Sequence, residues 1–282
     1  MREKLRVLVD DILGLERIEV DIFRGRSPQG ATQRVFGGQV AAQALAAALR
    51  TAPEDRDVHS LHAYFLRPGD PTVPIVYTVD RLRDGRTFTT RRVIGVQHGR
   101  PIFTTSVQLA TREEGFEHAE PMPAAPDPES LPPADLHQVP DAHGKLEPWA
   151  WGESLEMRFP GGAPTRGRTE ARQQVWFRTI DRLPDNAVLH ACVLTYASDM
   201  SLLGVTLAPH GGELARRGGG IQVGSLDHAV WFHAPARPDE WLLYDQVSPW
   251  AAHARGLARG TIWTRSGTLV ATVVQEGLIR PS

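Results

Sequence analysis

The segment VLHACVLTYASDMSLL, residues 188–203, decides how the chain folds, because it is apolar on nearly all sides at helical spacing. A helix of this kind has to be buried. It carries one carboxylate, Asp199, whose helical neighbours include Cys192, Tyr196 and Met200. Such neighbours do not solvate a charge, so the carboxylate requires hydrogen-bonding partners or a chemical task. The alternative is an ordinary Asp at a helix end that turns toward solvent or caps the following turn.

The composition is that of a soluble globular protein with one large or two ordinary domains. The chain has 282 residues, of which 41% are hydrophobic and 23% are charged. The 31 Lys and Arg against 33 Asp and Glu leave a net charge of −2, and no long basic run occurs, so no nucleic-acid partner is expected. The single cysteine, Cys192, excludes an internal disulfide and favours a reducing compartment, so we expect a cytoplasmic location.

Signatures of several other protein classes are missing from the sequence. The N-terminal residues lack an apolar core followed by a small-residue cleavage site, and no apolar run approaches the length needed to cross a bilayer. Neither secretion nor stable membrane insertion is therefore expected. Gly-x-Ser-x-Gly, His-Glu-x-x-His and Walker A motifs are also absent, as is Gly-x-Gly-x-x-Gly after a strand.

Two similar patterns of helix and strands follow each other along the chain. The first predicts a short helix and a half-buried strand within residues 3–22, a helix over 36–49, and strands over 61–65, 73–81, 88–97 and 102–109. The second predicts strands over 155–158 and 173–178, the helix of the opening segment, and strands over 224–232, 241–247, 254–263 and 270–277.

Residues 116–150 separate the two patterns. They contain eight of the 22 prolines and show no periodicity, which is typical of a linker rather than a packed element. We therefore predict an N-terminal repeat over residues 1–115, a Pro-rich linker over 116–150 and a C-terminal repeat over 151–282.

The two halves also match in detail, which predicts a duplicated unit of one helix followed by an antiparallel meander. The segment 62–65, His-Ala-Tyr-Phe, aligns with 228–231, His-Ala-Val-Trp, and Gln108 then aligns with Gln275, at spacings of 46 and 47 residues. Upstream, the same alignment places Gln39 opposite Asp199. A sheet curled around each helix would bury it, and two repeats joined edge to edge would remove exposed strand edges.

These segments resemble the acyl-CoA thioesterase II family, whose chains have a double hotdog fold. The resemblance covers both halves. The parts that do not match are mainly the linker and a Gly-rich loop after residue 210. It implies an α+β fold of two repeats, each an antiparallel sheet wrapped around a long central helix. The segments that carry it are 36–39, FGGQ; 59–69, HSLHAYFLRPG; 195–199, TYASD; 226–233, LDHAVWFH; 254–256, ARG; and 274–277, VQEG.

The resemblance implies hydrolysis of acyl-CoA thioesters without a covalent intermediate, a metal or a bound cofactor. In that family an Asp on the second helix, a Thr on a following strand and a Gln on the last strand hold the attacking water. Asp199 and Gln275 match, and Ser225 stands at the Thr position. The hydroxyl is kept while the rotamer restriction of the lost methyl group is weakened. These three catalytic residues lie in the C-terminal repeat.

Candidate substrate contacts are Arg91, Arg92, Arg255 and Gly224. The arginines either meet the phosphates of CoA or pair with neighbouring carboxylates. Free fatty acid and CoA are the expected products, and a homo-oligomer of such chains is expected.

Other reactive side chains have an ordinary explanation beside a functional one. Cys192 is a nucleophile, paired with His190 or His228, or an inert packing residue on a buried helix. Four histidines have two possible interpretations, as metal ligands or as strand residues whose spacing the duplication explains: His59, His62, His228 and His233.

Two other function classes remain open at this point. A hotdog-type enoyl-CoA hydratase or dehydratase generally uses an Asp and His pair, and a non-catalytic acyl-CoA-binding protein needs no buried base. Release of free thiol from acyl-CoA distinguishes hydrolysis from both alternatives.

Overall fold

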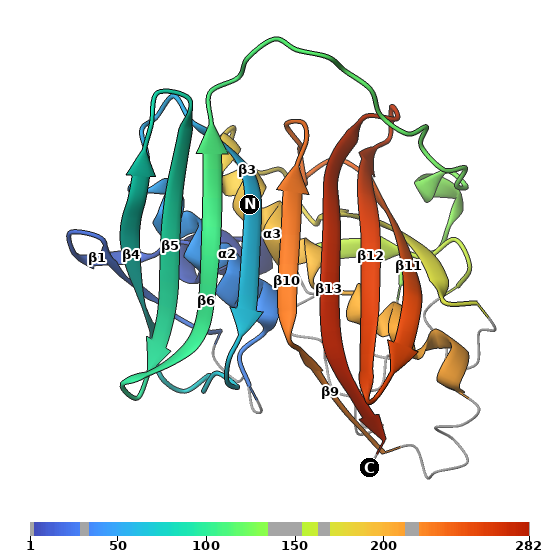
Figure 1. Ribbon diagram of the computed structural model, residues 1–282. Helices are drawn as coiled ribbons and strands as arrows, with labels where there is room; N and C mark the ends of the chain where they lie inside the picture. Colours follow the sequence, from blue (N-terminus) through green and yellow to red (C-terminus); the bar gives the residue numbers. More distant parts are fainter. Residues whose placement is uncertain (1–2, 29–33, 135–153, 163–169, 212–219, 282) are drawn as a thin grey trace.

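The computed structural model describes residues 3–28, 34–134, 154–162, 170–211 and 220–281. Within these ranges, 13 strands form one antiparallel sheet, and the two long helices lie together behind its centre (Figure 1). This arrangement agrees with the predicted α+β architecture of antiparallel strands wrapped around central helices.

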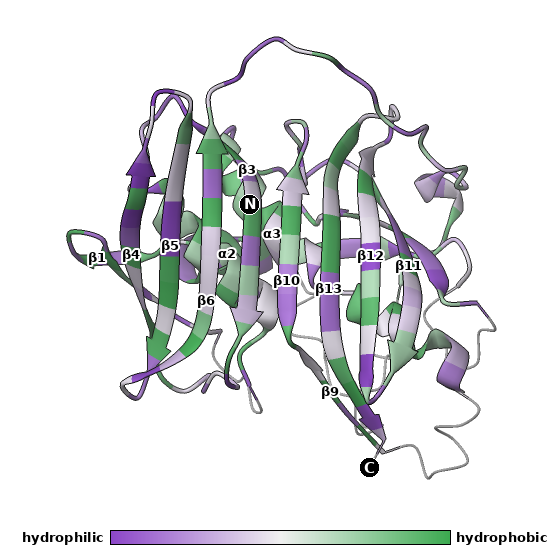
Figure 2. Ribbon diagram, viewed as in Figure 1, coloured by the Kyte–Doolittle hydropathy of each residue, from purple (hydrophilic) through white to green (hydrophobic). Residues whose placement is uncertain are grey.

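The first half begins with two short helical turns and a hairpin, followed by a helix and four strands, the last three of which form a meander. The strand directly after the helix pairs with the last of the four rather than with the next one, which corrects the prediction of a continuous meander. The bounds of these elements are α1, Glu3–Arg6; η1, Val7–Ile12; β1, Glu16–Glu19; β2, Ile22–Gly25; α2, Gly37–Leu49; β3, Asp57–Phe65; β4, Ile75–Asp84; β5, Phe88–Gln97; and β6, Arg100–Ala110. The strand β5 alternates buried and more exposed residues, as the banding along the strands shows (Figure 2).

The second half repeats this order, and the strand region after its helix is divided in two. Its elements are η2, Pro128–Ser130; β7, Leu155–Arg158; β8, Arg172–Thr179; α3, Ala187–Ser198; η4, Leu203–His210; β9, Ile221–Ser225; β10, Asp227–Phe232; β11, Leu242–Ala252; β12, Arg255–Thr264; and β13, Leu269–Pro281. The predicted strand over 224–232 is divided at Leu226 into β9 and β10. Both pair with β13, at different parts of its length, and β10 also pairs with β3.

The two halves are joined edge to edge through β3 and β10. The sheet order is β1-β2-β4-β5-β6-β3-β10-β13-β12-β11-β8-β7, and β9 pairs with β13 outside this path. In the junction, His228 lies opposite Ala63 and Val230 opposite Leu61. The edges that each repeat would expose are thereby paired with each other.

The opening segment forms a helix that is shorter than predicted. Asn186 caps the start of α3 by accepting a hydrogen bond from the Leu189 N–H, and the helix ends at Ser198. There the Ser198 hydroxyl donates to the Thr195 carbonyl, and Tyr244 Oη donates to the Ser198 carbonyl at 3.0 Å. These side chains satisfy carbonyl groups at the helix end, so the backbone bends at Asp199 and continues as η4.

Taken together, residues 187–210 are long and apolar enough to cross a bilayer, contrary to the expectation from the sequence that no run has this length. However, 78% of the apolar window is buried inside the protein, as in the core helix of a folded domain.

The helix α2 packs closely against the end of α3 because its first two residues, Gly37 and Gly38, lack side chains. A Cβ on Gly38 would lie 2.5 Å from the Tyr196 carbonyl oxygen, which is closer than atoms in van der Waals contact. The alanines of α2 are buried and let the sheet approach. While α2 packs under β4, β5 and β6, the segment η4 after Asp199 packs under β11, β12 and β13.

Two details of the first half differ from the predictions. The strand β1 is exposed at every residue rather than half-buried, because it lies at the outer end of the sheet and pairs only with β2 within the described chain. The predicted alignment of the repeats is also out of register: His62 is exposed whereas His228 is fully buried, and Gln108 is exposed whereas Gln275 is fully buried. Residues on opposite faces of a sheet are not equivalent, since side chains alternate between faces.

The Pro-rich segment crosses from the first half to the second above the strands (Figure 1). Residues 116–121 of this segment are exposed, as expected of a linker, whereas part of the stretch from 122 to 131 is packed, contrary to the prediction. Met122, Ala125 and Leu131 contact a cluster formed by Trp176, Trp241, Leu243 and Trp263. Residues 135–150 lie outside the described residues, and the predicted domain boundaries stay a prediction.

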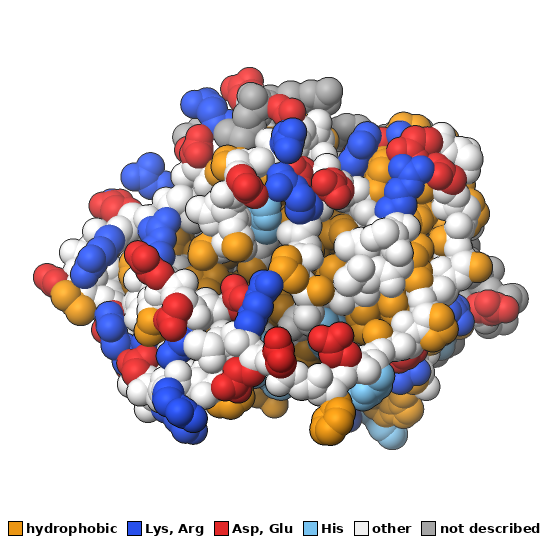
Figure 3. Space-filling view, turned by 90° about the horizontal axis from the view of Figure 1, so that it is seen from above, with side chains coloured by type: hydrophobic (Ala, Val, Ile, Leu, Met, Phe, Trp, Pro, Cys, Tyr) orange, Lys and Arg blue, Asp and Glu red, His pale blue; other side chains and the backbone are white. Residues whose placement is uncertain are grey.

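Charged side chains of both signs are interspersed on the face seen from above (Figure 3), in keeping with the net charge of −2.

Candidate active site

The structure brings together the three predicted catalytic side chains from three elements of the second half. Gln275 in β13 donates from Nε2 to Asp199 Oδ1 at 2.5 Å and to Ser225 Oγ at 2.9 Å. Ser225 Oγ lies 3.4 Å from Asp199 Oδ1. Gln275 is fully buried and Asp199 is 8% exposed, so the carboxylate at the helix end faces the interior.

The division between β9 and β10 places Ser225 beside Gln275. Ser225 pairs with Gly277 in the β9–β13 ladder, and the next residue, Leu226, donates its N–H to the Glu276 carbonyl. The carboxylate of Asp227 then accepts the Glu276 N–H at 2.7 Å. The ladder along this edge of β13 is therefore interrupted beside Gln275, between its pairing with β10 and its pairing with β9.

The first half contributes the start of α2 to this site, which the sequence analysis did not foresee. The Gly38 N–H donates to the Asp199 carboxylate, and a Cβ on Gly37 would lie 2.7 Å from Asp199 Oδ2. Phe36, the residue before the helix, provides no side-chain cap. Asp199 thus serves as the anion at the N-terminus of α2, where free N–H groups and the helix dipole favour negative charge. Two adjacent glycines opening an Ala-rich helix were the available signal.

Burial raises the pKa of Asp199 to about 6. Hydrogen bonds from Gln275, Gly38 and Ser225 oppose this shift by stabilising the ionised form, as does the positive charge of Arg34. A carboxyl group with this pKa is ionised at pH 7 and is still a better proton acceptor than an exposed aspartate.

Arg34 is a second residue that the sequence analysis missed, because it lies in a loop without periodicity. Its guanidinium donates to the Val223 carbonyl of β9. Its Nη1 would lie 3.2 Å from a Cβ on Gly224, so the absence of a side chain at this glycine leaves room for the arginine. A role of Gly224 in binding substrate stays a prediction.

Arg91 does not lie where it could meet a CoA phosphate. Its side chain is buried, and the guanidinium donates to Thr51 Oγ1, to the Thr51 carbonyl and to Asp84 Oδ1, at 3.0, 3.0 and 2.6 Å. These bonds hold the end of α2 against β4 and β5. The interpretation of Arg91 as a substrate contact is corrected to a structural role.

Arg92 and Arg255 are exposed, and each pairs with a carboxylate. Arg92 lies 2.6 Å from Asp80. It belongs to β5, and the strands β6, β3 and β10 lie between β5 and β13, so Arg92 is not next to the strand that carries Gln275. Arg255 lies 3.2 Å from Glu276, the residue after Gln275. Of the three arginines, Arg255 lies on the strand adjacent to the site, and its contact with CoA stays a prediction.

Cys192 is buried, and burial raises the pKa of its thiol to about 12, so the reactive thiolate is disfavoured. His190 and His228 have other partners, the Pro184 carbonyl at 2.9 Å and Ser198 Oγ at 2.8 Å. This placement supports the packing interpretation of the cysteine.

The remaining histidines and Gln39 occupy separate positions. His59 stacks edge-on with Phe88, His62 with Trp231, and His233 contacts Thr272 Oγ1 at 2.8 Å. Among the described residues, no group of three potential ligands is close enough to hold a metal ion. Gln39 is buried and donates to the Arg26 carbonyl and Ser27 Oγ, which are structural hydrogen bonds within the first half.

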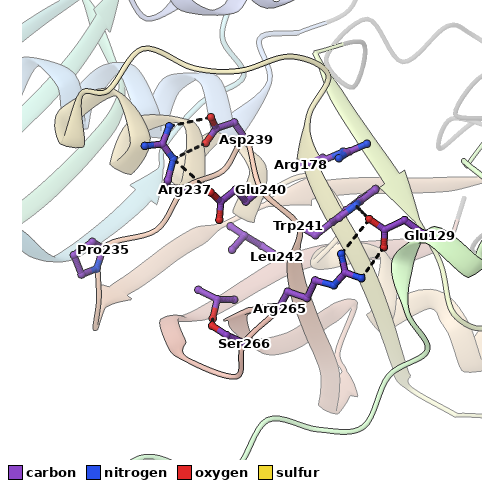
Figure 4. Close-up of a pocket in the computed structure, with 11 residues that line it drawn as sticks. Glu129, Arg178, Pro235, Arg237, Asp239, Glu240, Trp241, Leu242, Arg265 and Ser266 are labelled. Carbon is purple, nitrogen blue, oxygen red and sulfur yellow. Dashed lines mark hydrogen bonds and ion pairs between the residues drawn. The ribbon is translucent and has the colours of Figure 1, made fainter.

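A separate cavity of about 670 Å³ lies in the second half, and none of the three predicted catalytic residues lines it (Figure 4). Its arginines are all paired with carboxylates: Arg178 with Glu156, Arg237 with Asp239, and Arg265 with Asp127 and Glu129. The cavity therefore presents no unpaired cation for a phosphate.

Comparison with known proteins identifies first the class and then the family. A solved structure described as a protein with a hot dog fold, from Alicyclobacillus acidocaldarius, is 21% identical and covers 97% of this chain and 98% of its own, with a TM-score of 0.79. This likeness shows the fold, and the predicted double hotdog architecture is confirmed.

Sequence profiles then match both halves, "Acyl-CoA thioesterase N-terminal domain" over residues 25–110 and "Acyl-CoA thioesterase" over residues 157–278. Acyl-coenzyme A thioesterase 8 of Homo sapiens is 38% identical, and the match covers 97% of this chain and 89% of that protein. Acyl-CoA thioesterase 2 of Haemophilus influenzae is also 38% identical, and the match covers 95% of this chain and 96% of that protein. The structure of an acyl-CoA thioesterase II from Mycobacterium marinum is 46% identical over 97% and 98%, with a TM-score of 0.82. The chain belongs to the acyl-CoA thioesterase II family, as the resemblance implied.

Proposed function

We propose that the chain hydrolyses acyl-CoA thioesters by direct attack of a water molecule that Asp199, Ser225 and Gln275 hold. The enzyme class, thioester hydrolase, follows from membership of the family. The observation that supports the mechanism is the position of Gln275 Nε2, which binds both Asp199 Oδ1 and Ser225 Oγ. One amide thus links the carboxylate and the hydroxyl that would share a water.

Asp199 acts as the general base in this mechanism. It takes a proton from water while the water oxygen bonds to the thioester carbonyl carbon. The carbon–sulfur bond then breaks, the same proton passes to the sulfur of the leaving thiolate, and the products are a free fatty acid and CoA. Ser225 and Gln275 restrict the water before attack, so less entropy is lost in the transition state.

The start of α2 has a second use in the same mechanism. Its positive end binds Asp199 through the Gly38 N–H, so a thioester attacked by a water held on Asp199 would have its carbonyl oxygen, on which negative charge develops, near the same helix end. Donors fixed before the reaction stabilise this charge without reorganisation.

The alternatives predicted from the sequence are separated by one assay. Incubation with saturated acyl-CoA of several chain lengths should release free thiol and stop doing so in Asp199→Asn. Hydration of an enoyl-CoA leaves the thioester intact, and binding alone leaves the substrate unchanged. Absence of thiol release from every acyl-CoA tested would contradict the proposed function.

Isotope labelling tests the absence of a covalent intermediate. A single turnover in H₂¹⁸O with excess enzyme should place ¹⁸O in the fatty acid and leave Asp199 unlabelled by mass spectrometry. An acyl-aspartyl intermediate hydrolysed at the aspartyl carbon would place the label in Asp199 instead.

We further propose a cytoplasmic homo-oligomer without membrane insertion. A lone buried cysteine supports a reducing compartment, and the exposed apolar side chains of Tyr64 and Leu66, two residues apart at the end of β3, support contacts with another copy of the chain. Cell fractionation and light scattering of the purified protein test these two points separately.

A further inference from the structure

His228 is a buried titratable residue beside Asp199 that the proposed hydrolysis does not use. It lies in β10, it is fully buried, and its Nδ1 is 3.9 Å from Asp199 Oδ1. Within the described part of the chain, Nδ1 has no hydrogen-bond partner. A buried nitrogen without a partner costs free energy, so its position calls for a functional explanation.

The bonds of Ser198 bear on which nitrogen of the ring carries the proton. Its hydroxyl is placed to donate to the Thr195 carbonyl at 2.9 Å and lies 2.8 Å from His228 Nε2, a contact in which either atom can donate. With its single proton in the bond to Thr195, Ser198 Oγ accepts a hydrogen bond from Nε2–H, and the inference rests on this tautomer. Burial lowers the pKa of His228 to about 4, so the ring is neutral near pH 7 and Nδ1 is a bare acceptor.

We propose that His228 is a positioning residue that makes Asp199 a stronger base by presenting the Nδ1 lone pair to its carboxylate. This lone pair repels the ionised carboxylate and accepts a hydrogen bond from the protonated carboxyl group. A movement of about 1 Å brings the two atoms to hydrogen-bonding distance. Asp199 carries the proton from the attacking water to the leaving sulfur, and His228 neither gains nor loses one.

The other groups that face Asp199 act in the opposite direction. They favour the ionised carboxylate and come from β13, β9, α2 and the loop before it: the Gln275 amide, the Ser225 hydroxyl, the Gly38 N–H and the charge of Arg34. From β11, Tyr244 donates to the Ser198 carbonyl rather than to the carboxylate. His228 therefore offsets donors that would otherwise leave Asp199 a weak base.

The pH dependence of kcat/KM in two substitutions tests the inference. The amide oxygen of His228→Asn can occupy the place of Nδ1, whereas His228→Gln puts its amide near Ser198 and leaves no acceptor at Nδ1. The acid limb is the part of the profile in which kcat/KM rises with pH as Asp199 ionises. In His228→Gln we expect this limb to move to lower pH by about 0.5 unit or more, and the maximal kcat/KM to be severalfold lower. In His228→Asn we expect the limb to stay at the wild-type position.

His233→Gln is the matched control, because His233 follows β10 directly and contacts Thr272 rather than the site. Its acid limb should coincide with that of the wild type. If the acid limb is unchanged in both His228 variants, His228 has only a structural role. If the limb of His228→Gln moves to higher pH, Nδ1 donates a hydrogen bond to Asp199. Either result overturns the inference.

If the His228 variants do not fold, a measurement on the wild-type enzyme still tests the inference. Neutron diffraction from deuterated crystals should show deuterium on Nε2 of His228 and none on Nδ1, and the reverse overturns the inference. The inference rests on the proposed role of Asp199 as the base, and different results would contradict the inference and the proposed function. Full activity of Asp199→Asn would contradict the base itself, whereas an unchanged limb in an Asp199-dependent enzyme contradicts only the role of His228.

Discussion

Gln275 Nε2 lies 2.5 Å from Asp199 Oδ1, so the last strand of the sheet binds the carboxylate that ends the buried helix. The same nitrogen lies 2.9 Å from Ser225 Oγ, which makes the three side chains one hydrogen-bonded unit. A unit of this kind loses function as a whole when one member is removed.

Asp199→Asn should lower kcat by a factor of about 10² to 10⁴, the usual effect of losing a general base. The amide has nearly the shape of the carboxylate, so affinity for acyl-CoA should be kept. Single-turnover kinetics and a binding titration measure the two effects. Turnover near that of the wild type in a folded variant would exclude Asp199 as the base.

The raised pKa of Asp199 also predicts how stability and activity depend on pH. Between the ordinary aspartate pKa of 3.8 and the folded value of about 6, the folded state binds more protons than the unfolded state. The free energy of unfolding therefore falls as pH rises through this window, by about 3 kcal/mol in total, while activity rises as Asp199 ionises. Asp199→Asn should lose this slope and be more stable than the wild type at pH 7. Denaturant unfolding at pH 5 and pH 7 measures the slope, and equal slopes in both proteins would contradict the prediction.

Gly37→Ala should lower kcat about tenfold or more, because the added Cβ would lie 2.7 Å from Asp199 Oδ2 and displace the carboxylate. Gly204→Ala is the matched control: Gly204 lies in η4, and a Cβ there meets no atom within 4 Å. Steady-state kinetics of both variants separate a local steric effect from a general effect of alanine. Equal activities would show that the start of α2 tolerates a side chain.

Cys192→Ala should keep activity within severalfold and lose about 1 kcal/mol of stability through a small packing defect. The thiol is buried, and its raised pKa disfavours the thiolate that a nucleophile requires. Thiol-release kinetics and thermal unfolding test this. Trapping of an acylated Cys192 by mass spectrometry would overturn direct attack by water.

Ser225→Ala should slow turnover strongly if the hydroxyl orients the water, whereas Ser225→Thr should retain or raise it, since a β-branched side chain has fewer rotamers to lose. Gln275→Ala should combine with Ser225→Ala non-additively, because both remove the same positioned water. The double variant should be little slower than the slower single one. Full additivity on one saturated acyl-CoA would mean that Ser225 and Gln275 do not share a water.

Much of the fold follows from local patterns that neighbouring residues carry. The apolar segment 188–203 required burial, and the alternation along residues 88–97 predicted β5 with its observed bounds. The wrong register of the repeat alignment has a local cause as well. A shift of one residue leaves hydropathy and spacing similar but moves every side chain to the opposite face, as for His62 and His228.

By itself the sequence determined the two buried helices, the strands around them and, through the resemblance, the residues Asp199, Ser225 and Gln275. Only the tertiary structure decided the surroundings of the carboxylate. Gly37 and Gly38 meet Asp199 across the two halves, and His228 faces it from the strand that joins them. Such contacts depend on helix packing and strand register over long sequence separations, and these follow from the whole core rather than from any local run of residues.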